Sequence, residues 1–184
     1  MDTAKTIENL AKAFEAAARA VQQQGFELES HAVLMASSVN AGLALEFYAK
    51  CLSQLSVGHY PKSHSLKTIL EKLPASIRSN LRNAFNDSGV DEIRDQIRQV
   101  ETHSGTTIDS DFDSVVSNWS RVFVEGRYWF ECSGTSSKPP LNVFFYDHLV
   151  RVMSDAITKQ RASKSPCNQA MKPSGTGSPG LGSG

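Results

Sequence analysis

One stretch of the sequence constrains the fold more than any other: from Ser30 to about Leu55 the chain is apolar on nearly every side. A helix of this kind has to be covered, either by other helices or by a membrane. Its longest uncharged part, Ser30 to Leu45, has only 16 residues, includes three serines and an asparagine, and stops at Glu46, so it is too short and too polar to span a bilayer. We therefore expect a central buried helix, capped at Ser30, and no membrane partner.

Helical periodicity recurs along the rest of the chain, and no segment alternates with period two for long. The periodic segments cover about residues 3–22, 66–73, 74–85, 93–100, 111–130 and 141–160. Asp109 or Asp111 is placed to cap the long helix that ends near Phe130. The pattern predicts an all-α bundle of about four long helices joined by short ones.

The composition fits one folded domain with a polar tail. The chain has 184 residues, of which 40% are hydrophobic and 21% charged, enough apolar area for one core. Twelve of the last twenty residues are Gly, Pro or Ser, which leaves little apolar area to hold that segment. We expect a helical domain over residues 1–162 and a disordered tail over residues 163–184.

Cysteine usage and charge limit the compartment and the partners. Cys51, Cys132 and Cys167 are odd in number and lack the paired spacing of zinc or redox motifs, which favours a reduced, cytoplasmic compartment and predicts neither a metal nor a cofactor. The first residues do not read as a secretion signal. Residues 151–184 carry a net charge of +4, which leaves −4 on the rest, so any nucleic-acid site must be local.

Several charged residues occur on otherwise apolar helices. Glu46 needs a partner because an unpaired buried charge is costly, and Lys50, one turn later, is the nearest cation in sequence. Arg127 and Glu131 lie one turn apart among aromatic residues, and a bidentate bond from Arg127 to Glu46 would fix the register of the bundle. His64 could either cap the next helix or reach Glu46.

These segments, GLALEFYAKCL, HSLKTILEKLP and FVEGRYWFE, resemble a subgroup of prokaryotic HEPN domains. The resemblance covers about residues 30–131. The matching positions are Glu46, Lys50, Ser63, His64, Leu66, Leu73, Pro74, Arg127, Tyr128 and Glu131. It implies a helical bundle, frequent homodimerisation, and RNA cleavage or nucleotide binding in toxin–antitoxin or phage-defence systems, with a cognate antitoxin or another protein as a further partner.

Nuclease members of this family have an Arg followed by His after four to six residues, and two such motifs meet across a dimer without metal. The matching pair here is Arg98 and His103, expected at and just beyond a helix end. Arg98 would hold the scissile phosphate and His103 would act as general acid or base. The alternative is a non-catalytic module, in which Glu46, Lys50, His64, Arg127, Tyr128 and Glu131 form a polar cluster that fixes the fold or binds a nucleotide or partner.

Overall fold

The computed structural model describes residues 2–28, 30–87, 90–105, 107–128 and 145–164, and within these ranges it contains helices and no strand. The helices are α1 (Thr3–Glu27), α2 (His31–Val57), α3 (Leu66–Glu71), α4 (Ala75–Asp87), α5 (Val90–Ser104), α6 (Phe112–Tyr128) and α7 (Tyr146–Lys164). The predicted all-α bundle is confirmed. The predicted tail lies outside the described residues from residue 165 onward.

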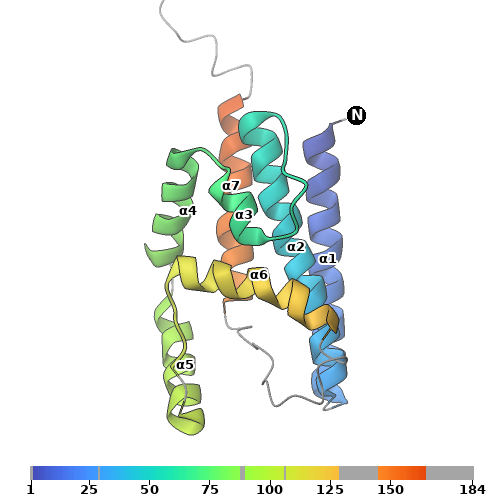
Figure 1. Cartoon of the computed structure of the whole chain (residues 1–184), viewed down its shortest axis with the longest axis vertical. Coiled ribbons are helices and arrows are strands. Elements are labelled where there is room, and N and C mark those ends of the chain that lie inside the picture. Colours follow the sequence, from blue (N-terminus) through green and yellow to red (C-terminus); the bar gives the residue numbers. More distant parts are fainter. Residues whose placement is uncertain (1, 29, 88–89, 106, 129–144, 165–184) are drawn as a thin grey trace, which may run out of the picture.

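The apolar segment forms α2, the centre of the bundle. Figure 1 shows α1, α2 and α7 side by side, with α6 crossing them and α4 and α5 to one side. Ala44, Leu45 and Leu52 of α2 are completely buried. Removal of this apolar surface from water is the main stabilising contribution to the bundle.

The pair formed by α1 and α2 depends on small residues. Ala11 and Ala18 of α1 are buried, which lets the two helix backbones approach closely. At Gly25 a Cβ atom would lie 2.8 Å from the side chain of Leu34, so glycine is needed for this approach. Gly58 ends α2 in the left-handed conformation, with φ of 81°, where a residue with a side chain would be strained.

Two of the predicted caps are present. The Ser30 hydroxyl accepts a hydrogen bond from the backbone N–H of Val33 at the start of α2. Of the two aspartates considered for α6, Asp111 is the cap, because its carboxylate accepts from the N–H groups of Asp113 and Ser114 at 3.0 Å each. A hydrogen bond from the Ser114 side chain, and after it these backbone bonds, lower the pKa of Asp111 because they stabilise its charged form.

The length of α2 bears on the membrane prediction. The described residues contain one helix that is long and apolar enough to cross a bilayer, Ala32–Val57, with a mean hydropathy of 1.3 over its best window. The prediction counted only the 16 uncharged residues and so judged this segment too short and too polar to span a bilayer, whereas the whole helix meets both criteria. However, 56% of that window is buried inside the molecule, as in the core helix of a bundle.

Candidate functional site: a buried ion pair beneath His64

A buried ion pair on α2 forms the base of the candidate site. Glu46 is 2% exposed and Lys50 7% exposed, and the Lys50 Nζ lies 2.6 Å from Glu46 Oε1. The ammonium also lies 5.8 Å from the centre of the Phe47 ring and 5.9 Å from that of Tyr60, distances at which cation–π attraction contributes. The prediction that Glu46 pairs with Lys50 is confirmed.

His64 lies on the loop between α2 and α3 and contacts this ion pair. Its Nδ1 is 3.2 Å from each oxygen of the Glu46 carboxylate. A carboxylate can only accept, so Nδ1 carries a hydrogen and donates it. The side chain of His64 remains 66% exposed. Of the two roles considered for His64, contact with Glu46 is the one observed, because Ser65 caps α3 by accepting from the N–H of Thr68.

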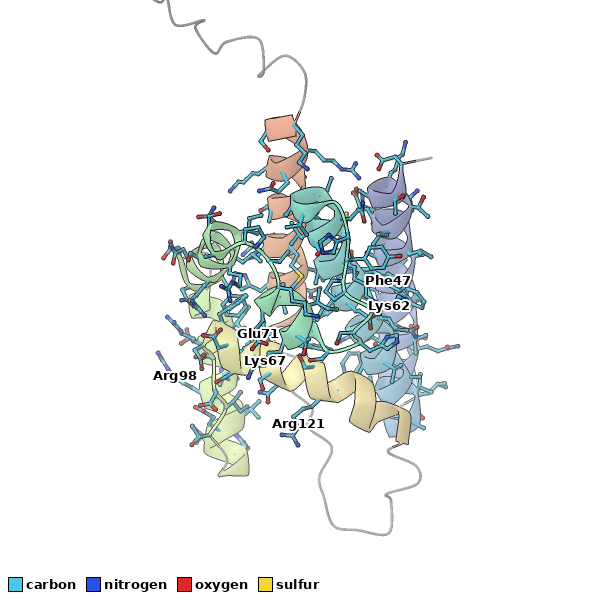
Figure 2. The ribbon with its side chains drawn as sticks, turned by 45° about the horizontal axis from the view of Figure 1, so that its top comes forward. Phe47, Lys62, Lys67, Glu71, Arg98 and Arg121 are labelled. Atoms are coloured by element: carbon cyan, nitrogen blue, oxygen red, sulfur yellow. The ribbon has the colours of Figure 1, made fainter. Side chains whose placement is uncertain are left out.

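Exposed basic side chains flank His64 in the sequence, and another lies on α6, which packs against α3. We call this surface the His64 face and define it by Tyr60, Lys62, His64, Lys67 and Arg121, all of which are exposed. The backbone N–H of Lys67 donates to the Ser120 hydroxyl at 2.8 Å, which joins α3 to α6 directly beside Arg121. Figure 2 shows Lys67 and Arg121 on these two adjacent helices.

The charge on this face is positive because Glu46 is neutralised from below. Lys50 balances the buried carboxylate, so Glu46 does not repel an incoming anion. Lys62, Lys67 and Arg121 then contribute three exposed positive charges, which exceed the single negative charge of the neighbouring Glu71. Because the body of the chain is acidic, a nucleic-acid site on it must be locally basic, and the His64 face meets this condition.

The remaining members of the predicted polar cluster cannot be placed. Arg127 and Tyr128 belong to the last turn of α6, but their side chains lie outside the described part of the chain, as does Glu131. The bidentate bond from Arg127 to Glu46 therefore stays a prediction.

The structure does not bring Arg98 and His103 together within one chain. Both are exposed on α5, and His103 lies in its last turn, where the sequence had suggested a position just past the helix. On an α-helix, two side chains five residues apart point in directions that differ by about 140°. Arg98 donates to Asp95 at 3.1 Å, and His103 Nδ1 lies 3.1 Å from the carbonyl of Gln99, which only accepts, so Nδ1 carries the hydrogen.

Arg98 is also far from the His64 face. Figure 2 shows Arg98 on the opposite side of the view from Lys62. The Arg98–His103 pair and the Glu46–Lys50–His64 cluster are thus two separate places on the molecule, and one function need not use both.

Sequence reasoning passed over His148, which is 3% exposed in the core. Its Nε2 donates to the Phe85 carbonyl at 2.8 Å and its Nδ1 accepts from the Arg151 guanidinium at 2.9 Å. Because one partner only accepts and the other only donates, the ring is neutral. Burial, with a further contribution from the nearby Arg151, lowers the pKa of His148. The only signal in the sequence was a histidine on the apolar face of a helix, which is typical of a packing residue.

Cys51 is a core residue of α2. Its thiol is fully buried and donates to the Ala4 carbonyl at 3.3 Å, and burial raises its pKa to about 11. A thiol with this pKa is a poor nucleophile at neutral pH. Within the described residues, no three His, Cys, Asp or Glu side chains are grouped so that they could hold a metal ion.

Comparisons with protein-family models, with curated proteins and with solved structures find no match. The resemblance to HEPN domains therefore rests on the short motifs quoted from the sequence. The function is therefore inferred from the geometry of the Glu46–Lys50–His64 cluster and of the Arg98–His103 pair.

Proposed function

We propose that this protein is a HEPN-like helical module that binds single-stranded RNA through the His64 face. The observation that carries the proposal is the buried Glu46–Lys50 pair, which orients the exposed imidazole of His64, with the exposed lysines Lys62 and Lys67 two and three residues away in the sequence. The HEPN resemblance supplies the substrate class, and the charge of the face supplies the attraction to phosphate.

The arrangement suits RNA for physical reasons. Burying two ions costs several kcal/mol each before their attraction is counted, so a neutral pair at this depth adds little net stability. It does fix the position of His64, whose Nδ1 is bonded to both carboxylate oxygens. The exposed Tyr60 ring, which is 41% exposed, offers a surface on which a base can stack.

The salt dependence of RNA binding tests the proposal. For single strands, the slope of log K against log salt changes by about 0.7 for each phosphate contact, so replacing Lys62 and Lys67 by Gln should reduce the slope by about 1.4. The measurement is fluorescence anisotropy of a labelled oligonucleotide in the presence of chelator. The control replaces Lys5 of α1 and Lys159 of α7 by Gln, an equal change of charge at other exposed positions. Equal slopes for the two double variants would refute binding at this face.

A second candidate function is a metal-independent endoribonuclease built on Arg98 and His103. The tautomer of His103 favours it, because donation from Nδ1 to the Gln99 carbonyl leaves Nε2 as the nitrogen that can accept a proton. Since the two side chains diverge on α5, a working site would need Arg98 and His103 from two copies of the chain. This candidate accordingly includes a homodimer.

Cleavage of labelled RNA in chelator tests this second candidate. The parent protein should produce fragments, and His103→Ala should produce none while its circular dichroism spectrum is unchanged. Cleavage retained in His103→Ala would remove His103 from the chemistry. Binding without cleavage in the parent protein would leave the RNA-binding module as the function.

A further inference from the structure

A pocket lies between α3, α4 and α6, and Lys67 of the His64 face is one of its lining residues. It has a volume of about 190 Å³ and an apolar floor. The floor is formed by Leu70, Leu81, Phe112 and Val116, all of which are buried. Charged side chains form its walls: Lys67, Glu71, Arg78, Arg82 and Asp113. Figure 2 shows Lys67 and Glu71 together on α3.

Arg78 is the unusual residue of this pocket. It is half-buried, and its Nε is shielded from water without a hydrogen-bond partner among the described residues. Arg82, one turn later, has its partner, because it donates to both oxygens of Asp113 at 2.8 Å each. A buried guanidinium N–H that has lost water and gained no acceptor is destabilising. An anion in the pocket would remove this cost.

The charge of the walls favours an anion. The three cations exceed the two carboxylates by one charge, and Asp113 is already occupied by Arg82. Glu71 is the carboxylate that opposes an anion here, and Lys67 and Arg78 line the same pocket. A guanidinium binds phosphate with two parallel hydrogen bonds, which is stronger and more specific than the contact of a point charge.

The size of the pocket limits the ligand. The volume of about 190 Å³ is well above the ~10–15 Å³ that a single enclosed water requires. This is room for a phosphate group and part of the sugar attached to it, and the apolar floor would contact the sugar. We propose that this pocket binds a terminal phosphate, either of a free nucleotide or of the 5′ end of an RNA strand, with Arg78 as the main contact.

This site goes beyond the proposed binding of RNA at the His64 face, and the two can fail independently. Lys67 contributes to both, so it does not separate them. Arg78 lies only in the pocket, and Lys62 only on the His64 face. The test of the pocket therefore uses Arg78 variants of the full chain.

Two binding measurements test the proposal. The first is isothermal titration calorimetry with AMP, with inorganic phosphate and with adenosine. The second is fluorescence anisotropy of labelled RNA that carries either a 5′-phosphate or a 5′-hydroxyl. The parent protein should bind at least one of the phosphate probes and should not bind adenosine. Arg78→Gln should weaken that binding by about tenfold or more, because a charge-assisted bidentate contact is lost. Arg78→Lys should retain part of the affinity, and Lys5→Gln, an equal change of charge on α1, should retain all of it.

The probes distinguish the two sources of the phosphate. Arg78-dependent binding of AMP indicates a free nucleotide, and Arg78-dependent binding of 5′-phosphorylated RNA alone indicates an RNA end. Absence of binding by every phosphate probe, or equal affinity in the parent and in Arg78→Gln, would overturn the proposal. Urea unfolding provides a second readout: because Arg78 lacks a partner, Arg78→Gln should not lower the stability, whereas loss of stability together with unchanged phosphate affinity would assign Arg78 a purely structural role.

Discussion

The buried pair of Glu46 and Lys50 allows a quantitative test of how the site is held. The relevant changes are Lys50→Met, which keeps the length of the side chain and removes its charge, Glu46→Gln, and the two together. Each single change leaves one buried ion without its main partner, since the two side chains are 9% and 3% exposed. Replacing both removes both ions.

The structure sets the expected magnitudes. Breaking a buried pair by removing one partner costs about 3–5 kcal/mol, and we expect Lys50→Met to reach this range because the carboxylate remains fully enclosed. Glu46→Gln should cost about 1 kcal/mol less, since the ammonium keeps its contacts with the Phe47 and Tyr60 rings. The double variant should cost much less than the sum, with a coupling energy of about 2–3 kcal/mol.

Urea unfolding at pH 7, followed by circular dichroism at the helix band, measures these free energies. His64→Ala is the matched control, because its side chain is 66% exposed and its loss should cost under about 1 kcal/mol. Additive single changes, or single costs below about 1 kcal/mol, would show that the pair is hydrated in solution. The argument that it positions His64 would then fail.

Three further predictions concern residues outside the Glu46–Lys50–His64 cluster. The pKa of His148 is lowered in the folded state, so the unfolded chain takes up a proton at a higher pH than the folded chain does. The free energy of unfolding should therefore fall as the pH drops below about 6.5, by up to about 1.4 kcal/mol per pH unit. Urea unfolding of His148→Gln at pH 5 to 8 should show a flatter dependence on pH. Cys51, buried and with its pKa raised to about 11, should react with a thiol reagent only after urea is added, and rapid reaction of the native protein at Cys51 would contradict its burial. Arg82→Ala should lower the unfolding free energy by about 1 kcal/mol or less, although its Nη2 donates to both oxygens of Asp113, because both side chains are exposed. A loss above about 2 kcal/mol would mean that the pair is less hydrated than the structure indicates.

The fold could be predicted to a large extent because burial and periodicity are local properties of the sequence. The apolar segment from Ser30 onward had to be central, and it became α2. Helix ends were less certain. The sequence stopped the first helix near residue 22, but α1 continues to Glu27, since Gly25 packs against Leu34 and the helix keeps a buried face beyond the regular pattern.

The candidate site was predictable only where its contacts are local. Lys50 lies one turn from Glu46, so their pairing follows from helix geometry. The choice between two roles for His64 depended on where the loop places it relative to α2, which no spacing in the sequence reveals. The pocket at Arg78 requires three helices to meet, and its only signal in the sequence was a pair of arginines one turn apart on α4.

The geometry of α5 constrains any catalytic role of Arg98 and His103 more strongly than the motif itself does. Side chains that point about 140° apart cannot act on one phosphate from a single helix, so a second copy of the chain would have to contribute. In a two-fold dimer, Arg98 of one copy would face His103 of the other only if the two α5 helices pack together. Such packing would also have to displace Asp95 from Arg98, because a carboxylate 3.1 Å from the guanidinium competes with phosphate for the same donor. Asp95→Asn should therefore raise RNA cleavage if Arg98 holds the phosphate, and cleavage that does not change would place the phosphate contact elsewhere.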